Sequence, residues 1–511
     1  MKQKPDILMI VLDTQRADRL AAYGFGREIS PNLDALAAES VQFHRAIAPA
    51  QWTVPSHASL FTGCYPWAHG MSQMDSVLAP HLPTLAARLK AIGYHTVGFS
   101  NNPLVGVIPN GLERDFNVFH NYGGLLTMRP QSASHGSNHF SVRHSFGYLQ
   151  PLLRRIQGYV ARAPEPVRFL FSPPFFALWQ RILRLRGAAK GDSARSLDDA
   201  AQLLIQRPGQ VAERPIFGFI NLMGVHTPYA PPQWAINRFV PQALCAQASG
   251  PALWRFNVIL HQLLGPLSEP LTAEVAALCN GLYNAEVAAQ DQLLGAFLQR
   301  LHRAGALDRL LLIVLADHGE QLGEQNLLGH GFAAYESLLH VPLLIRPPGA
   351  PLHHQPGVSD FVSTRRLFHT ILTVAGAASP AEERLSLLQT EPAASEQGIV
   401  LAEARPPHTA IELIEARHPG LLAKARLDRV HHAIYQQEHK LIIMGEEQLL
   451  YAIPHDRHET TDLHKVKPML VKSLLQSFHR ELHSPVSSYV RTNVGASDLT
   501  LQQRLKSLGY G

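Results

Sequence analysis

The sequence predicts an α/β protein built around a mostly parallel β-sheet with helices on both faces. Short apolar segments alternate with helix-like segments from residue 7 to residue 375, which is the pattern of consecutive β-α-β units. The apolar segments are continuous rather than alternating, as expected of strands buried on both faces. The composition agrees, since 46% of the 511 residues are apolar and 17% are charged, which excludes a disordered chain.

Five apolar segments predict the strands of this sheet, in the order Ile7–Leu12, His95–Ser100, Ile216–Met223, Leu310–Ala316 and Val341–Arg346. Four segments have helical patterns: Asn32–Glu39, Thr84–Ala91, Ala273–Ala304 and Thr364–Ala375. Sheets of this class bind ligands beyond the carboxyl ends of their strands. Since Asp13 and Asp317 directly follow two of the predicted strands, the candidate site is predicted there.

The composition divides the chain into three regions. We expect a main α/β domain over residues 1–376, interrupted by insertions at about 121–190 and 241–270. A small α+β domain should cover residues 377–483, followed by a polar, extended tail over 484–511. Within the small domain the predicted elements are strands at Ala433–Gln436 and Lys440–Met444 and a helix at Pro468–Leu482.

The first insertion contains a basic, aromatic segment. Residues 151–190 carry eight Lys or Arg residues and one Glu. One interpretation is an interfacial helix that contacts an anionic membrane surface. The other is a lid packed over the site, which we favour because Pro173 and Pro174 interrupt any long amphipathic helix.

Charge and cysteine content exclude several classes of protein. A net charge of +5 is too small to indicate nucleic-acid binding, and no nucleic-acid motif is present. Three Cys residues cannot form a disulfide framework. The apolar segment Ile7–Leu12 is too short for a signal peptide or a membrane helix. We therefore expect a cytoplasmic protein; the sequence leaves its oligomeric state open.

Asp13 is the first candidate for chemistry. A carboxylate at the end of a buried strand is unfavourable unless a positive charge pairs with it, and a divalent cation is a natural partner. The alternative is an ordinary helix N-cap. Asp317 and His318 follow another strand and combine a hard oxygen with an imidazole, a pair that suits Zn, Mn or Ca.

Thr53 and His226 are the next candidates. Thr53 leads into a helix predicted around Ser56–Phe61, and a helix N-terminus favours a tetrahedral anion. A hydroxyl at that place can attack phosphorus; the alternative is a plain Thr cap. His226 follows a predicted strand and could donate a proton to a substrate oxygen or a leaving group, or be a structural loop residue.

Taken in order, these motifs resemble the sulfatase family of the alkaline phosphatase superfamily. They are Asp13-Thr-Gln-Arg-Ala-Asp18, Thr53-Val-Pro-Ser56 with Thr62-Gly63, His226-Thr-Pro-Tyr229 and Asp317-His-Gly-Glu320. The resemblance extends to Pro31–Asp34, to the helix at Tyr283–Leu298, to Val341–Ile345 and to Leu450–Leu463. One motif would be a weak signal, but motifs in this order at strand ends and helix starts are specific.

The resemblance implies a three-layer α/β/α sandwich with a small C-terminal domain, and it assigns roles to residues of this chain. The metal ligands would be Asp13, Thr53, Asp317 and His318, binding a divalent Ca, Mn or Zn ion. The catalytic residues would be Thr53, His226 and His330. The substrate-binding residues would be His57, His226 and His330. In many relatives a Lys lies near the position of His330.

The sequence departs from the family at its defining position. Sulfatases carry Cys or Ser where Thr53 stands and convert it to formylglycine within Cys-x-Pro-x-Arg, but here the motif ends in His57. Cys64 begins a similar pattern eleven residues later, also without the Arg. Thr14 stands where many sulfatases have a second metal-binding Asp, so Gln15 or water would complete the shell.

These departures favour phosphoester chemistry. An ordinary Thr ester must be opened by attack at its central atom, which is feasible for a phosphoryl group. We expect a hydrolase or transferase acting on a phosphate mono- or diester. The alternatives are a sulfuric ester hydrolase without formylglycine and an inactive anion-binding protein. The substrate would be a small-molecule, glycan or lipid phosphate or sulfate ester.

Overall fold

The computed structural model describes residues 4–106, 108–123, 190–349, 357–389 and 398–482. The basic segment predicted at 151–190 lies outside the described residues except for its end at Lys190, and so does the tail predicted over 484–511. Among the described helices, none combines the length and the apolar character needed to span a bilayer.

The central sheet has nine strands, and the predicted ones are all present. Its order is β10-β2-β11-β7-β1-β5-β3-β4, with β12 paired to β2. The strands that build the site edge are β1 (Asp6–Leu12), β5 (Ile216–Leu222), β3 (His95–Ser100), β7 (Leu310–Leu315) and β4 (Val118–Asn121). All of these pair in parallel, so their carboxyl ends meet at one edge of the sheet.

The other half of the sheet is mixed and was predicted only in part. The segment Val341–Arg346 forms two strands, β10 (His340–Val341) and β11 (Leu343–Arg346), separated by Pro342. Proline has no N–H to donate to a strand ladder, which accounts for the break. The strands β2 (Val41–Ile47) and β12 (Val358–Ser363) were not predicted.

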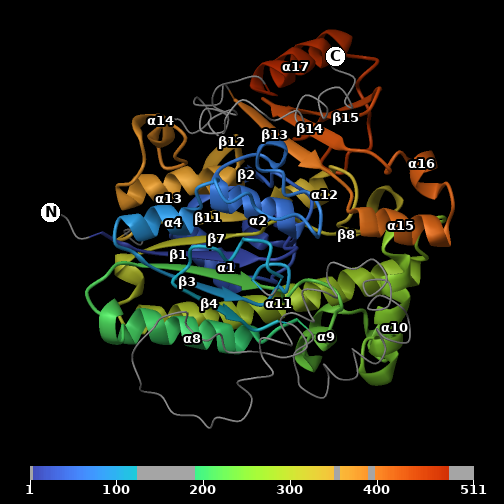
Figure 1. The fold of residues 1–511 in the computed structure, drawn as a ribbon. Coiled ribbons are helices and arrows are strands. Elements are labelled where there is room, and N and C mark those ends of the chain that lie inside the picture. The colour runs from blue at the N-terminus through green and yellow to red at the C-terminus, as the bar shows by residue number, and fades with distance from the viewer. Residues whose placement is uncertain (1–3, 107, 124–189, 350–356, 390–397, 483–511) are drawn as a thin grey trace.

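Helices cover both faces of the sheet, which makes the predicted three layers (Figure 1). Alternate residues of β1 divide between the faces: Leu8, Ile10 and Leu12 lie in one apolar core, and Ile7, Met9 and Val11 in the other. The first core includes α1 (Pro31–Ala38), α8 (Ser193–Gln206), α9 (Gln233–Phe239), α10 (Gly250–Leu263) and α11 (Ala273–Arg303). The second includes α2 (Thr53–Thr62), α4 (Leu85–Ala91) and α13 (Leu367–Ala375).

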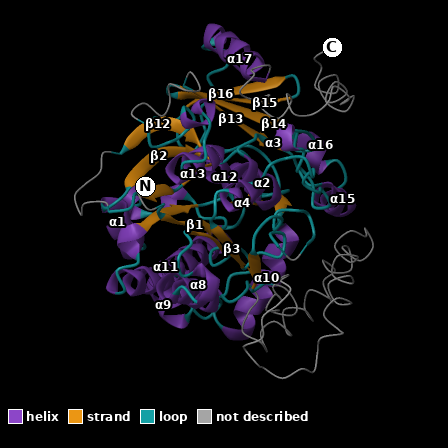
Figure 2. Cartoon of the chain, turned by 60° about the vertical axis from the view of Figure 1, so that its left-hand side comes forward, coloured by secondary structure: helices purple, strands orange, loops and turns teal. Residues whose placement is uncertain are grey.

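A second, antiparallel sheet lies toward the C-terminus. Its order is β13 (Ile399–Ala404), β14 (His431–Gln436), β15 (His439–Met444) and β16 (Glu447–Ala452). Helix α17 (Pro468–Leu482) packs on one face, as Figure 2 shows, while the other face packs on residues of the central sheet and its loops. The short helices α3 (Pro66–His69), α14 (Pro380–Glu383), α15 (His408–Arg417) and α16 (Leu421–Ala425) lie in connecting segments.

Three very short strands form a third sheet next to the site edge. They are β6 (Gly265–Pro266), β8 (Gln321–Leu322) and β9 (Leu327–Gly329). Because β8 and β9 pair as a hairpin, they bring Glu320 and His330 to the same end. Strand β6 comes from the insertion predicted at about 241–270, which is therefore packed against this hairpin.

A buried ion-pair cluster joins the C-terminal sheet to helix α12 (Glu336–Leu339). Lys440 on β15 has no exposed surface, and its Nζ lies 3.0 Å from Glu336 Oε1 and 2.7 Å from Glu459 Oε1. Glu336 begins α12, and Tyr435 donates a hydrogen bond to it. Two carboxylates thus share one ammonium group. Burial raises the pKa of Glu459 to about 7, with Lys440 opposing this and the Glu336 charge adding to it.

Candidate active site

The predicted carboxylates meet at the edge of the sheet. Asp13 follows β1 directly, Asp317 lies two residues beyond β7, and neither side chain is exposed. Since β1 and β7 are parallel neighbours, their following residues are adjacent in space. Ligand atoms of Asp13, Asp317 and His318 all lie within 4.8 Å of one another. The described residues therefore contain an Asp-Asp-His group that could hold a metal ion.

Two oxygens of this cluster accept no hydrogen bond, although His318 Nε2 lies 3.4 Å from Asp317 Oδ2 and 3.9 Å from Asp13 Oδ1. Asp13 Oδ2 accepts hydrogen bonds from Asn102 at 2.6 Å and from Asn221 at 3.4 Å. Asp13 Oδ1 and Asp317 Oδ2 are buried and accept none. Burial, and then the charge of Asp13, raise the pKa of Asp317 well above its usual value. A divalent cation would neutralise both carboxylates, so the residues present fit the metal that was predicted.

Thr53 is the first residue of α2 and lies beside the cluster. Its Oγ1 is 3.4 Å from His318 Nε2 and 3.4 Å from Asn102 Nδ2. One helical turn holds this arrangement, because Ser56 Oγ donates a hydrogen bond of 2.7 Å to the Asp317 carbonyl. The hydroxyl thus lies at a helix N-terminus, where partial positive charge and free N–H groups favour an anion.

His57 lies behind Thr53 and is fully buried. Its Nδ1 is 2.9 Å from the Thr53 carbonyl, and Asn221 Nδ2 is 3.2 Å from its Nε2. Both ring nitrogens therefore have partners within the protein if Nδ1 carries the proton. Burial lowers the pKa of His57, so the ring is neutral.

The turn after β1 is strained. Thr14 has a φ of 62°, a left-handed conformation that is unfavourable for a β-branched residue. Tyr283 Oη donates to the Thr14 carbonyl at 2.7 Å and accepts from the Arg16 N–H at 2.9 Å, which holds the turn. Thr14 Oγ1 and Gln15 Oε1 are buried without a hydrogen bond. These two oxygens are further possible metal ligands in the loop that follows Asp13.

Three histidine rings form a row at the site. The His318 and His330 ring centroids lie 4.6 Å apart, and those of His330 and His226 lie 4.9 Å apart. His330 Nδ1 is 3.0 Å from Glu320 Oε1 across the β8–β9 hairpin. Burial opposes protonation of His330, but the Glu320 carboxylate outweighs it and raises the pKa of His330. Burial, and then the charge of His330, lower the pKa of His226.

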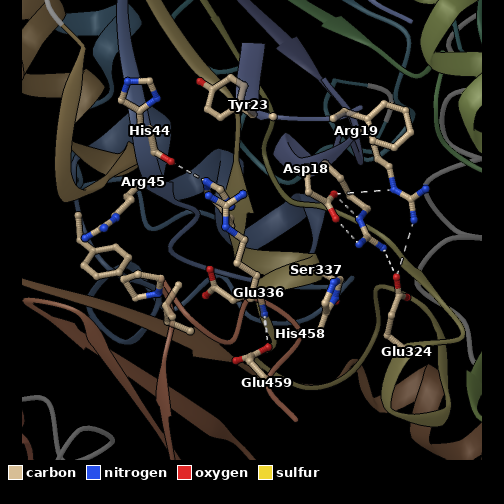
Figure 3. A pocket seen from close by; sticks show the side chains of 18 of the residues that line it. Asp18, Arg19, Tyr23, His44, Arg45, Glu324, Glu336, Ser337, His458 and Glu459 are labelled. Carbon is tan, nitrogen blue, oxygen red and sulfur yellow. Dashed lines mark hydrogen bonds and ion pairs between the residues drawn. The ribbon is translucent and has the colours of Figure 1, made fainter. Parts of the chain in front are cut away.

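The Arg16 side chain links the loop after β1 to the loop after β7, the two loops that carry the Asp-Asp-His group. It pairs with Asp18 at 2.7 Å and Glu324 at 2.7 Å, and donates to the Glu320 carbonyl at 3.0 Å. These groups border a cavity of about 600 Å³ that extends toward the C-terminal sheet, and Figure 3 shows Asp18, Arg19 and Glu324 facing one another there. None of the seven predicted site residues lines this cavity.

The family model named Sulfatase matches residues 5–377 of the chain. The chain belongs to the sulfatase family. It is an ester hydrolase of the alkaline phosphatase superfamily, and both the expected family and the fold class are confirmed. Members of this family use divalent metal ions, which agrees with the Asp-Asp-His group.

Individual sulfatase-family relatives differ in the ester that their names describe. The arylsulfatase of Clostridium perfringens is 23% identical over 398 residues, which cover 75% of this chain and 78% of that protein. The structure of BT4656 in complex with D-glucosamine-2-N,6-O-disulfate has a TM-score of 0.62 at 14% identity, covering 99% and 98% of the two chains. The phosphonate monoester hydrolase of Agrobacterium radiobacter has a TM-score of 0.57 at 21% identity, covering 93% and 96%.

Cys64 lies at the wrong end of α2 to replace the family cysteine. Helix α2 has ten residues and so spans roughly 15 Å, with Thr53 at its start and Cys64 beyond its C-cap Gly63. Burial raises the pKa of the Cys64 thiol to about 11, which favours the neutral thiol over the nucleophilic thiolate.

Four site residues were not predicted from the sequence. Asn102 contacts both Asp13 and Thr53, and Asn221 contacts both Asp13 and His57. Glu320 orients His330, and Ser56 holds the start of α2 to Asp317. A usable signal existed for Asn102, because it follows β3 at the same edge of the sheet as Asp13. Asn221 lies within a strand and carries no comparable sequence signal.

Proposed function

We propose that this sulfatase-family enzyme cleaves a phosphate mono- or diester, or transfers its phosphoryl group, with Thr53 as the nucleophile. One observation carries the proposal: the Thr53 hydroxyl lies at the start of α2, 3.4 Å from His318 Nε2, in a group that includes two buried carboxylate oxygens without a hydrogen bond. This combination provides a nucleophile, an anion site and a cation site at one point.

The type of nucleophile favours phosphorus over sulfur. A formylglycine hydrate releases sulfate by collapsing to an aldehyde, whereas a threonine ester has no such exit. The ester on Thr53 must instead be opened by water or an acceptor alcohol that attacks the central atom. Phosphoryl transfer proceeds by this in-line displacement, with the protein supplying position and charge.

The first step joins Thr53 to the substrate. Thr53 Oγ1 loses its proton to solvent water and attacks phosphorus, a P–O bond to Thr53 forms, and the P–O bond to the alcohol breaks. A divalent ion bound by Asp13, Asp317, His318 and Thr53 would lower the pKa of the hydroxyl and offset charge on the ester oxygens. We assign Ca, Mn or Zn to this place, since carboxylate and imidazole donors suit these ions.

Two histidines of the row, His330 and His226, donate and accept the protons of the reaction. His330, held by Glu320 through Nδ1, donates a proton from Nε2 to the departing alcohol oxygen. His226 Nδ1 donates to the Thr227 carbonyl, which leaves Nε2 free to accept the proton of the incoming water or alcohol. That second attack breaks the bond to Thr53, and the proton held by His226 passes to the Thr53 oxygen and restores the hydroxyl. His330 regains its proton from solvent. Asn102 donates toward Thr53 Oγ1, and His57 positions the first turn of α2.

A second candidate function is hydrolysis of a sulfate ester by the unmodified threonine. The arylsulfatase relative and the sulfated glucosamine bound by a structural neighbour favour it. Either function places a small-molecule or glycan ester at the row of histidines.

A side-by-side assay tests the proposal. Wild-type protein is given an aryl phosphate, a bis-aryl phosphodiester and an aryl sulfate, each with Mn, Zn or Ca added after removal of metal with EDTA. We expect metal-dependent turnover of one of the two phosphorus esters above that of the sulfate. Faster turnover of the sulfate would establish the second function instead. Turnover of none of the three, with metal bound, would leave an anion-binding protein and contradict both.

A further inference from the structure

A buried ion pair lies next to the loop that carries His226. Lys190 Nζ is 2.5 Å from Glu286 Oε1, and the two side chains are 11% and 6% exposed. Lys190 precedes α8, and Glu286 lies in the middle of α11. A buried ion pair is rarely more stable than an apolar pair of similar volume, so its retention calls for a geometric reason.

The pair holds both ends of the loop from Gly224 to Ala230. Lys190 Nζ donates to the Gly224 carbonyl at 2.6 Å, and Glu286 Oε1 accepts from the Ala230 N–H at 2.5 Å. One charged pair therefore binds the backbone on both sides of His226. These are charge-assisted hydrogen bonds, which are shorter and stronger than neutral ones.

Two neighbouring contacts also hold the backbone of this loop in place. Asn257 of α10 accepts from the Tyr229 N–H and donates to the Tyr229 carbonyl, both at 2.8 Å. Gly224 lies so close to α11 that a Cβ there would be 2.5 Å from Gln290 Oε1. The loop backbone is thus fixed at several points around His226.

The place of the His226 ring depends on this backbone. Its Nδ1 hydrogen bond goes to the Thr227 carbonyl, which belongs to the same loop. Its other close contact is the His330 ring, at a centroid distance of 4.9 Å. A shift of the loop would therefore carry the ring with it, away from His330.

We propose that Lys190 and Glu286 are positioning residues that set the place of His226 relative to His330 and Thr53. Neither side chain touches the metal cluster; both act through the loop backbone. The inference rests on the proposed role of His226 in proton transfer. A misplacement of about 1 Å at such a site costs roughly 100-fold in rate.

A double-mutant cycle tests this role with the metal-loaded, full-length protein. Lys190→Met removes the charge and the donors while keeping the length of the stem. We expect kcat to fall roughly 100-fold with KM changed less than about threefold. In the His226→Ala background the same substitution should cost less than about twofold, because the group being positioned is gone. Equal losses in both backgrounds would overturn the proposal and indicate general damage.

Two further variants guard against loss of folding. Glu286→Gln keeps the acceptor for Ala230 and nearly the same volume, so it should fold and show a smaller fall in kcat. Lys190→Arg retains charge and donors and should restore part of the rate lost in Lys190→Met. Arg207→Met is the matched control, since it breaks a 2.6 Å ion pair with Asp6 at the opposite end of the sheet. It should leave kcat unchanged.

The outcomes separate this inference from the proposed function. If His226→Ala turns over like the wild type, the proton-transfer role of His226 fails, and the inference fails with it. If His226→Ala is impaired while both Lys190→Met and Glu286→Gln keep the wild-type kcat, only the positioning role is overturned.

Discussion

Strand β1 carries a buried aspartate at each end, and the two have opposite surroundings. Asp6 Oδ2 lies 2.6 Å from Arg207 Nη1 and 3.0 Å from Arg309 Nε, and its other oxygen accepts from the Ile216 N–H at 2.8 Å. Asp13 accepts hydrogen bonds from the amides of Asn102 and Asn221, and its second oxygen accepts none. The two residues are 4% and 0% exposed.

The difference shows what distinguishes a structural carboxylate from a functional one. At the amino end of β1 the chain supplies the positive charge itself. At the carboxyl end it places a second carboxylate, Asp317, beside the first and supplies neutral amides and imidazoles. In the cluster around β15 the chain also supplies a positive charge of its own, because Glu336 and Glu459 share Lys440. Of these three groups of described residues, the one at Asp13 has no Lys or Arg partner, so a cation from solution would balance its charge.

The largest expected effect is a loss of turnover when Thr53, which lies beside the Asp13 cluster, is replaced. Thr53→Ala removes the proposed nucleophile and should reduce turnover more than about 1000-fold, as loss of a nucleophile does in other hydrolases. The matched control is Thr62→Ala at the last turn of the same helix, where Oγ1 donates to the Ala58 carbonyl. That variant should keep its turnover. Steady-state kinetics with both proteins decide the matter, and equal rates for Thr53→Ala and wild type would remove Thr53 from its role.

The next effect compares the two ends of β1 directly, in protein freed of metal. Asp6→Asn leaves Arg207 and Arg309 without their buried partner and should lower the free energy of unfolding by about 3 kcal/mol. Asp13→Asn removes one of two repelling carboxylates and should leave the free energy of unfolding equal to or above that of the wild type. Urea unfolding in EDTA measures both. A large loss for Asp13→Asn would mean that the chain already balances this charge.

The smallest expected effect is a change of stability with pH that arises from the ion-pair cluster of Lys440, Glu336 and Glu459. Glu459 binds its proton more tightly in the folded state, with a pKa of about 7 against 4.5 in the unfolded chain. Its stabilising contribution is therefore complete below about pH 4.5 and is lost as the pH rises through 7. Relative to Glu459→Gln, the free energy of unfolding of the wild type should fall by at least about 1 kcal/mol between pH 4.5 and pH 8. Unfolding curves at both pH values test this, and a constant difference would contradict it.

The sequence allowed prediction of the parts of the site that depend on parallel strands. Asp13, Asp317 and His318 follow continuous apolar segments. The carboxyl ends of parallel strands lie at one edge of the sheet, so residues that follow them are close together. Thr53 was found through helix start signals, and its hydroxyl does lie beside His318. The central β-strands and the helices were predicted closely for the same reason.

Other parts of the site and the fold could not be predicted, because the residues that form them show no recognisable sequence pattern. The β8–β9 hairpin that joins Glu320 to His330 has strands of two and three residues, too short for any periodic pattern. Strand β2 carries the polar residues Gln42, His44 and Arg45 and is only partly buried, so it lacks a continuous apolar pattern and was missed. Lys190 meets Glu286 across 96 residues, a contact that only the folded chain reveals.

We infer that Asp13 Oδ1 and Asp317 Oδ2, which accept no hydrogen bond, bind a divalent cation. Calorimetric titration of metal-free protein with Mn²⁺ tests it most directly, in the wild type, in Asp317→Asn and in Asp6→Asn. We predict saturable binding to the wild type and to Asp6→Asn, and binding at least about tenfold weaker in Asp317→Asn, equal to a loss of 1.4 kcal/mol or more. Equal affinity in all three proteins, or no binding of Mn²⁺, Zn²⁺ or Ca²⁺ to the wild type, would contradict the account.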